Sequence, residues 1–384
     1  MNVAVIGAGH AGVEAARCLA EAGAKVAVFS ADSVLPYFRP RLVAVAFGQA
    51  EPDAIRMHPP GWYADRRIDL VLDHRITAGD LAAGRVVSGS GDRAFDGIVM
   101  ATGSLPVLPP FAAAAPERIL PLWNLNHAGR IRRLVRPGGR AVVVGGGILG
   151  IEAALRAAEA GMHAVIVECM ERLMPVHFGA RASAVLLRRM ERKGVEVHTK
   201  RIVGRALEDT ATGRAVLELD NGIALTADIC VVAMGARPDL SLAQQAGLAE
   251  ERGIRVNDYL QTSAPRVFAA GDVVMFRGVS RCSAREAVAQ GKSAALNLIA
   301  LLRGQPMAAY KSAYAPLSFK SAGIELYAAG EPARAGYDEI CLDGTSEDVY
   351  RAIVAREGRS VGVQMVGSGA GFDELVQGLG KPTG

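Results

Sequence analysis

Residues 3–12 read Val3-Ala4-Val5-Ile6-Gly7-Ala8-Gly9-His10-Ala11-Gly12. Their apolar start predicts a buried strand, after which residues 13–22 favour a helix and residues 25–29 a second strand. The first glycine allows a tight turn, the second lets a pyrophosphate approach the backbone, and the third lets helix and strand pack closely. The phosphates then lie at the positive end of the helix. The stretch therefore predicts a dinucleotide-binding βαβ unit, and the alternative is a glycine-rich turn in an ordinary α/β domain.

A second glycine fingerprint follows a predicted strand over residues 140–144 and reads Gly145-Gly146-Gly147-Ile148-Leu149-Gly150. Residues 151–160 favour a helix and residues 163–167 a strand, which Glu168 closes. A carboxylate at this place accepts hydrogen bonds from both ribose hydroxyls of an adenosine and repels a 2′-phosphate. We therefore expect the second site to prefer NADH to NADPH. The alternative is that Arg172, four residues later, reaches a phosphate.

The first fingerprint differs at the end of its second strand. Ser30 stands there, and Asp32 follows two residues later. A serine hydroxyl can bond a ribose hydroxyl, but it is a weaker acceptor than a carboxylate. Either Ser30 or Asp32 is therefore expected to hold the first adenosine. In the alternative, Asp32 only caps the following turn.

The two fingerprints form an internal repeat. One fingerprint alone indicates a simple dehydrogenase, whereas two indicate one resident and one diffusing dinucleotide, as when a flavin takes hydride from a nicotinamide. Residues 228–238 also echo the predicted strand and turn of residues 96–106. We therefore expect an α/β protein with two nucleotide sites.

Composition narrows the class of protein. Half of the 384 residues are apolar, which is enough for two or three domains with their own cores. The net charge of +4 is spread out, and the basic segments 130–136 and 188–193 fit solvated helix faces, so no nucleic acid is expected as a partner. No stretch of about eighteen uncharged apolar residues occurs, and the start leads directly into a strand. We expect a cytoplasmic protein without a membrane span.

The five cysteines, at positions 18, 169, 230, 282 and 341, are scattered. Their spacing matches no metal site or redox pair, so neither a disulfide framework nor a bound metal is expected. Cys18 and Cys230 stand among apolar residues of a predicted helix and a predicted strand. Both are expected to be small core residues.

Further motifs accompany the two fingerprints. They are Ala101-Thr102-Gly103, Gly235-x-Arg237-Pro238, and Thr262-Ser263 followed by Phe268-Ala269-Ala270-Gly271-Asp272. Together these motifs resemble the FAD-dependent pyridine-nucleotide oxidoreductases of the glutathione-reductase type, over the whole chain. The resemblance implies two Rossmann-like three-layer dinucleotide-binding domains and a small C-terminal α+β domain. The FAD domain would span residues 1–107 and 234–308, the inserted NAD domain residues 108–233, and the C-terminal domain residues 309–384.

Two further segments narrow the resemblance. Tyr37-Phe38-Arg39-Pro40 is similar to the Tyr-x-Arg-Pro segment of rubredoxin, ferredoxin and nitrite reductase flavoproteins, and residues 316–321 are similar to their Pro-x-x-x-Lys-Thr passage. Disulfide reductases of this fold need a cysteine pair beside the flavin. No cysteine occurs between residues 19 and 168, so thiol chemistry at the flavin is not expected.

The resemblance also implies which residues bind the two nucleotides. For FAD they are Gly7, Gly9, Gly12, Arg39, Pro40, Ile76, Thr102, Gly103 and Asp272, together with Ser30 or Asp32. For NAD(H), the co-substrate, they are Gly145, Gly147, Gly150, Glu168 and Gly235.

Two side chains are candidates for a catalytic role. Glu152 matches a glutamate that lies near the nicotinamide in ferredoxin-reductase relatives and pairs there with a lysine, but Ala44 stands at the lysine position here. The alternative for Glu152 is an ordinary helix residue facing solvent. Lys320 and the start of a helix near Ala284 are expected to stabilise the anionic reduced flavin. The alternative for Lys320 is an ordinary surface lysine.

The electron acceptor is left open by the sequence. The main interpretation is an NADH-dependent flavoprotein that passes electrons to a small acidic iron-sulfur carrier such as a rubredoxin or ferredoxin, helped by the mildly basic charge. Three alternatives stay open. The protein reduces a small molecule such as oxygen or a quinone, it serves as the reductase of a nitrite reductase partner, or it senses NADH without turnover. The chain is expected to be a monomer or a homodimer.

Overall fold

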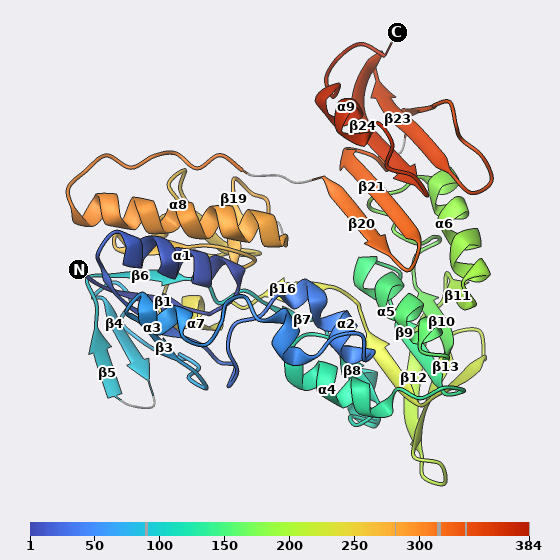
Figure 1. Cartoon of the computed structure of the whole chain (residues 1–384), viewed down its shortest axis with the longest axis horizontal. Coiled ribbons are helices and arrows are strands. Elements are labelled where there is room, and N and C mark those ends of the chain that lie inside the picture. Colours follow the sequence, from blue (N-terminus) through green and yellow to red (C-terminus); the bar gives the residue numbers. More distant parts are fainter. Residues whose placement is uncertain (89–90, 281, 313–315, 335, 384) are drawn as a thin grey trace. The chain divides into compact units, whose positions relative to one another are not determined.

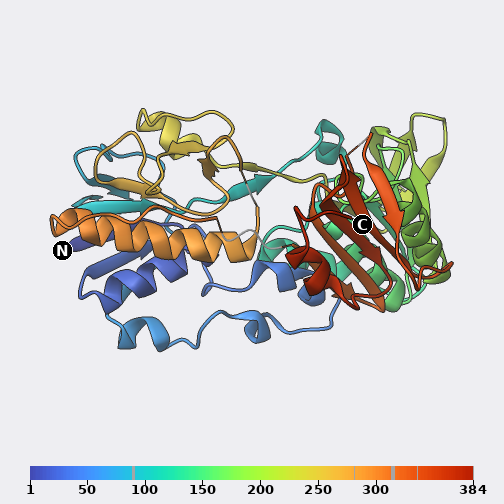
Figure 2. The same ribbon diagram turned by 90° about the horizontal axis from the view of Figure 1, so that it is seen from above.

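The computed structural model describes residues 1–88, 91–280, 282–312, 316–334 and 336–383 (Figure 1). The chain divides into two compact units. Unit 1 comprises Met1–Pro40, Pro52–Leu105 and Ala236–Ala315, and unit 2 comprises Arg41–Glu51, Pro106–Gly235 and Pro316–Gly384. Each unit thus combines segments that are far apart in the sequence, as the colours of Figure 2 also show. The four expected domain segments stay a prediction.

Unit 1 is built on a parallel sheet with the strand order β18-β6-β1-β2-β3. The central strands are continuous apolar runs, which is the pattern of a parallel sheet covered on both faces. Helices α1 and α8 pack side by side along this sheet (Figures 1 and 2). The main elements are β1 (Asn2–Ile6), α1 (His10–Glu21), β2 (Lys25–Phe29), β3 (Ile68–Val71), β6 (Gly97–Met100), β18 (Val267–Ala269) and α8 (Ala284–Leu302).

Shorter elements complete unit 1. They are the one-turn helices α3 (Trp62–Asp65) and α7 (Ser241–Gln245), the hairpin of β4 (Arg85–Ser88) and β5 (Gly91–Ala94), and the pairs β7 (Ser104–Pro106) with β16 (Ala236–Pro238) and β17 (Ile254–Val256) with β19 (Val274–Phe276). Short 3-10 turns cover Arg39–Arg41 and Pro52–Ile55.

Unit 2 contains a second parallel sheet with the strand order β11-β10-β9-β15-β8. An antiparallel sheet of three strands, β12-β13-β14, follows β11 in the chain. The elements are α2 (Leu42–Ala46), β8 (Ile119–Pro121), α4 (Leu125–Leu134), β9 (Arg140–Val144), α5 (Ile148–Glu159), β10 (His163–Glu168), α6 (Ala180–Arg192), β11 (Val195–Thr199), β12 (Val203–Asp209), β13 (Arg214–Leu219), β14 (Ala224–Ala227) and β15 (Ile229–Val232), with a 3-10 turn at Pro110–Ala114.

The last part of unit 2 is a five-stranded antiparallel sheet with the order β20-β21-β24-β23-β22. A small apolar core joins this sheet to the C-terminal helix, where Tyr327 lies 5.1 Å from Phe372 between ring centroids. The elements are β20 (Leu317–Ser321), β21 (Ile324–Gly330), β22 (Asp338–Cys341), β23 (Tyr350–Arg356), β24 (Arg359–Val366) and α9 (Phe372–Gln377).

Most expected elements are confirmed, and the two helices after the glycine turns begin earlier than expected. The helix expected from residue 13 begins at His10 and the helix expected from residue 151 begins at Ile148, because the extended backbones of Gly9 and Gly147 cap them. Residues 75–78 alternate between polar and apolar side chains as a strand does, but they form no strand, since only Ala78 forms a bridge, with Val87. The proline-rich segment 105–110 begins inside strand β7, which pairs with β16. Prolines are tolerated there because this two-stranded pair consists of edge strands.

Cys18 and Cys230 are buried, as expected of core residues. The basic segments 130–136 and 188–193 fall mainly on helices α4 and α6. Among the described residues, no helix combines the length and the apolar character needed to cross a membrane. Within the same residues, no group of three or more His, Cys, Asp or Glu side chains could hold a metal ion.

Candidate nucleotide-binding sites

The first glycine turn, in unit 1, has a geometry that only glycine permits. Gly7 has a φ of +108°, and a Cβ there would lie 2.1 Å from the carbonyl oxygen of Ala101. A Cβ at Gly12 would lie 1.9 Å from the carbonyl oxygen of Gly7. Gly7 and Gly12 are therefore required by the packing of β1, α1 and the turn after β6, which is the tight-turn and close-packing role expected from the sequence.

Gly9 is different, because a Cβ there would meet nothing within 4 Å. It is the N-cap of α1, and no side chain accepts a hydrogen bond from the first turn of the helix. The N-terminal N–H groups of a helix are left without intrahelical partners and attract anions. Open space in front of unpaired donors fits the pyrophosphate of a dinucleotide.

Ser30 and Asp32, just after strand β2 in the first site, make different hydrogen bonds. Ser30 is buried, and its hydroxyl accepts a hydrogen bond from the Asp32 N–H at 3.2 Å. The Asp32 carboxylate instead accepts bonds from the Tyr37 hydroxyl at 3.2 Å and from Arg39 at 3.4 Å. Ser30 therefore caps the turn. Asp32 carries the half-buried carboxylate that is available to a ribose.

The Gly271-Asp272 turn, predicted to belong to the first site, is held by two hydrogen bonds. The Ser104 hydroxyl donates to the Asp272 carboxylate at 2.7 Å, and the Gly271 N–H donates to the Gln290 side chain of α8 at 2.8 Å. Burial raises the pKa of Asp272. Ser104 and Gln290 were not identified from the sequence. The position of Ser104 directly after Ala101-Thr102-Gly103 is the sequence signal that could have identified it.

The remaining expected FAD residues are all in unit 1. Ile76 is buried, and the Thr102 hydroxyl donates to the carbonyl oxygen of Asp239 at 3.1 Å. Gly103 has a φ of +72°, with open space where a Cβ would stand. Pro40 is exposed within the Arg39–Arg41 turn.

His10 belongs to the first turn of α1, beside the candidate pyrophosphate position. Its ring centroid lies 5.8 Å from that of Phe38. Burial, and then the charge of Arg39, lower the pKa of His10. Phe38 and Arg39 are far from His10 along the chain, so no local sequence pattern predicts this environment.

The second glycine turn, in unit 2, repeats the backbone of the first. Gly145 has a φ of +118°, and a Cβ there would lie 2.4 Å from the carbonyl oxygen of Ala233. A Cβ at Gly150 would lie 1.9 Å from the carbonyl oxygen of Gly145. Gly147 caps α5 without a side-chain bond, and a Cβ there would meet nothing within 4 Å. The same open, donor-lined space therefore exists a second time.

Glu168 ends β10 as a buried carboxylate. One oxygen accepts the Gly146 N–H at 2.5 Å and the other accepts the Met170 N–H at 2.7 Å. The second of these oxygens also accepts the Cys169 thiol at 3.4 Å, and the oxygen bonded to the Gly146 N–H can accept one more bond, so Glu168 is fixed at the end of the strand with acceptor capacity to spare. Gly146 is itself constrained, because a Cβ there would lie 2.6 Å from the Leu173 side chain.

A cavity of about 280 Å³ lies beyond the ends of β10 and β11. Its wall contains two cations, Arg172 and Lys200, together with Glu171. Arg172 donates to the carbonyl oxygen of Phe178 at 3.1 Å and pairs with Glu171. The side chain proposed to reach a phosphate therefore already has two partners.

The two candidate catalytic residues, and Gly235, lie in unit 2. Burial raises the pKa of Glu152, whose helix α5 packs on α2, the helix that contains Ala44. The nearest cation along the helix, Arg156, bonds Glu159 at 2.7 Å instead. Lys320 lies on β20, 3.3 Å from Glu325 and 64% exposed. Gly235 has a φ of +88° and open space where a Cβ would stand. The roles of all three residues stay predictions.

Known proteins resemble this chain over most of its length. The ferredoxin–NAD(+) reductase component of the biphenyl dioxygenase system of Paraburkholderia xenovorans is 33% identical over 275 residues, 71% of this chain and 67% of that protein. Nitrite reductase [NAD(P)H] of Bacillus subtilis is 26% identical over 97% of this chain, which spans only 46% of that protein. The structure of the covalent putidaredoxin reductase–putidaredoxin complex matches with a TM-score of 0.87 and 28% identity, over 98% of this chain and 92% of that one.

The model of one protein family, the pyridine nucleotide-disulphide oxidoreductases, matches residues 1–291. This range contains both glycine turns and the Gly271-Asp272 turn, and it exceeds half of the chain. The open, donor-lined turns fit the two cofactors of such enzymes, FAD and the co-substrate NAD(H). The chain is therefore an oxidoreductase enzyme and belongs to the pyridine nucleotide-disulphide oxidoreductase family.

Proposed function

We propose that this enzyme takes hydride from NADH onto FAD and passes the electrons to a small, acidic redox protein such as a rubredoxin or a ferredoxin. The observation that carries the proposal is the duplicated turn. Gly9 and Gly147 each cap a helix whose N-terminus has open space in front of it. Only in the second unit does the following strand end in a carboxylate, that of Glu168. One resident and one exchanging dinucleotide fit this arrangement.

The residues of unit 1 would hold the FAD. Gly7, Gly9 and Gly12 would bind its pyrophosphate, Asp32 its adenosine ribose, and Asp272 its ribityl side. The rest of the FAD site would be lined by Arg39, Pro40, Ile76, Thr102 and Gly103. When bound, the flavin supplies an acceptor for a hydride and a donor of electrons.

The residues of unit 2 would bind the NADH. Gly145, Gly147 and Gly150 would hold the pyrophosphate, and Glu168 the adenosine ribose. Because the Glu168 carboxylate is fixed by two backbone N–H groups, it cannot readily turn away from a 2′-phosphate. A preference for NADH over NADPH follows from this repulsion.

Thiol chemistry is disfavoured in the FAD-binding unit. Cys18 and Cys282 are free thiols there. Cys18 is buried and Cys282 is exposed, and partial desolvation of the sulfur raises the pKa of each to about 11. At neutral pH both thiols are protonated and are poor nucleophiles. Electrons would therefore leave the flavin without a protein disulfide.

Two relatives support a protein acceptor. One is a reductase of a ferredoxin, and the other is captured in a covalent complex with putidaredoxin. The proposed reaction places the enzyme in the cytoplasm with the NADH pool, as a monomer or a homodimer.

Anaerobic stopped-flow mixing tests the proposal. Mixing with NADH should bleach the flavin absorbance within milliseconds to seconds, and subsequent mixing with oxidised rubredoxin or ferredoxin should restore it faster than air does. Faster reoxidation by oxygen or a quinone would point to a small-molecule oxidase. A reduced flavin that persists with every acceptor would point to NADH sensing, and either result would contradict the proposal.

A further inference from the structure

Helix α8 is the longest helix of unit 1, and one of its faces is exposed along the whole length. The exposed positions follow helical spacing and thus form one stripe. We call it the α8 stripe; its members are Arg285, Val288, Lys292 and Leu296 of the helix and Arg303, the C-cap residue directly after it. Val288 is 38% exposed and Leu296 47% exposed, so the stripe includes two aliphatic side chains among its cations.

The α8 stripe combines positive charge with apolar surface. Of the 19 residues of α8, all described, Glu286 is the only acid, and it is buried with its carboxylate accepting a bond from the Ser312 hydroxyl at 2.8 Å. Within the described residues, no carboxylate lies within ion-pair distance of Arg285 or Lys292. By contrast, Arg132 of α4 and Arg192 of α6 are paired with acids.

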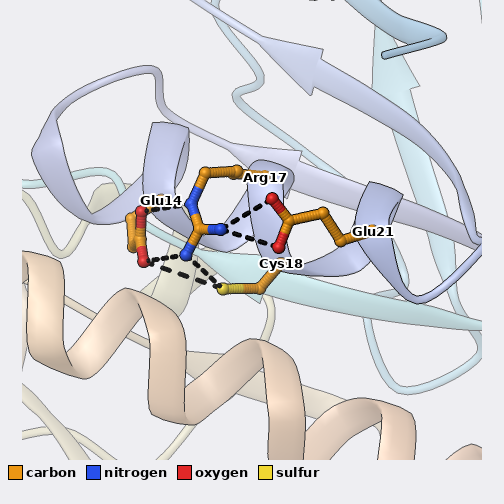
Figure 3. Close-up of polar contacts among 4 residues, drawn as sticks. All are labelled: Glu14, Arg17, Cys18 and Glu21. Carbon is orange, nitrogen blue, oxygen red and sulfur yellow. Dashed lines mark hydrogen bonds and ion pairs between the residues drawn. The ribbon is translucent and has the colours of Figure 1, made fainter.

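The neighbouring helix α1 does not cancel this charge. Figure 3 shows Arg17 between the two acids of that helix, 2.6 Å from the Glu14 carboxylate and 2.7 Å from that of Glu21. One of the two carboxylate charges is neutralised in this way. The three cations of the α8 stripe outnumber the single charge that remains.

The N-terminal end of the stripe lies beside the candidate FAD site. The Gly271 N–H bonds Gln290 of α8, and a Cβ at Gly271 would lie 3.8 Å from the Cβ of Ala287. Arg285 and Val288 are thus on the turns of α8 that pack against the Gly271-Asp272 turn. These contacts are made by the buried face of α8, so a protein seated at this end of the stripe is separated from the Gly271-Asp272 turn by the thickness of one helix, about 10 Å.

We propose that the α8 stripe is the docking surface for the electron acceptor, a small acidic iron-sulfur protein. This inference rests on the proposed function. Arg285 and Lys292 supply long-range attraction that steers an acidic partner, and Val288 and Leu296 supply the apolar contact that holds it. The charge complementarity selects an acidic protein over a neutral one.

The test reverses the charge of the stripe. Lys292→Glu and Arg285→Glu are compared with Lys25→Glu, an exposed lysine at the start of β2 in the same unit. The flavin is reduced with NADH, and the second-order rate constant of its reoxidation is measured with rubredoxin and with a [2Fe–2S] ferredoxin at several salt concentrations. Menadione, a small neutral acceptor, reports on the flavin itself.

Each stripe variant should lower the rate constant with the carrier roughly tenfold at low salt, with the difference shrinking at high salt. Lys25→Glu should change it less than about twofold, and menadione should reoxidise all variants equally. Carrier rates that are equal in stripe variants and wild type would overturn the docking surface while leaving the proposed function in place. If neither carrier binds or reoxidises the wild-type enzyme, the proposed function fails, and the docking surface fails with it.

Discussion

The two glycine turns have nearly the same backbone and different chemistry around it. Gly9 and Gly147 cap their helices with almost identical φ and ψ angles, −78° and −170° against −82° and −176°. The strand end, however, offers a hydroxyl in the first turn and a buried carboxylate in the second. The shared backbone suits a pyrophosphate in either turn, and the side chain at the strand end decides which groups can bind a ribose.

The helices that follow the turns show the same contrast. Each turn is followed by a glutamate at the same position, Glu14 in α1 and Glu152 in α5. Glu14 is paired with Arg17, as Figure 3 shows. At the equivalent place α5 has Leu155, and Arg156 bonds Glu159 instead. One carboxylate is therefore compensated, and the other has a raised pKa through burial.

The largest effect is expected from filling the space at the third glycine. Gly12→Val and Gly150→Val each force a side chain onto a backbone carbonyl oxygen that stands 1.9 Å from the Cβ position. Each should lower the free energy of unfolding of the cofactor-free protein by about 2–3 kcal/mol, measured by urea denaturation. Gly9→Ala and Gly147→Ala are the matched controls and should leave it nearly unchanged. Equal losses at all four positions would show that the glycines do not have separate roles.

The next effect concerns the strand ends. Glu168→Gln removes the negative charge and should raise the KM for NADH roughly tenfold, since a charge-assisted hydrogen bond is worth about 1.5 kcal/mol or more. The KM for NADPH should rise less or fall, because the repulsion of the 2′-phosphate is removed.

Ser30→Ala is the comparison in the first site. It should weaken FAD binding by only a few-fold, as expected for a neutral hydrogen bond that serves a turn. Fluorescence titration of the cofactor-free protein with FAD measures this change. A loss of FAD affinity as large as that for NADH in Glu168→Gln would assign the ribose to Ser30 instead of Asp32.

The smallest effect concerns the two helix glutamates. A buried carboxyl with a raised pKa binds its proton more tightly in the folded state. Its contribution to stability is therefore largest below the ordinary value of 4.5 and declines as the pH rises through the folded pKa. Glu152→Gln removes this decline and should be more stable than wild type by about 0.5 kcal/mol at neutral pH, with a smaller gain at acidic pH.

Glu14→Gln should have the opposite sign at neutral pH, because it loses a paired carboxylate worth about 0.5 kcal/mol. Urea denaturation of both variants at acidic and neutral pH makes the measurement. Parallel pH profiles for the two variants would show that the pairing of Glu14 and the burial of Glu152 do not matter.

The sequence predicted both turns because their requirements are local. A strand, three glycines and a helix are contiguous, and the clash distances at Gly7 and Gly12 explain why no other residue fits. It did not predict Ser104 or Gln290, whose partners stand 168 and 19 residues away. The sequence also did not show whether Ser30 or Asp32 faces the ribose, because in so short a turn either side chain can accept a backbone N–H.

The central claim is that the first turn holds a resident FAD and the second an exchanging NADH. Gly9→Asp and Gly147→Asp place a negative charge in front of the open helix N-termini. The direct measurement is the flavin absorbance of each purified variant before and after anaerobic addition of NADH. Gly9→Asp should be purified without flavin, and Gly147→Asp should retain flavin that NADH bleaches at least tenfold more slowly than in wild type. Flavin retained in Gly9→Asp, or lost from Gly147→Asp, would contradict the assignment.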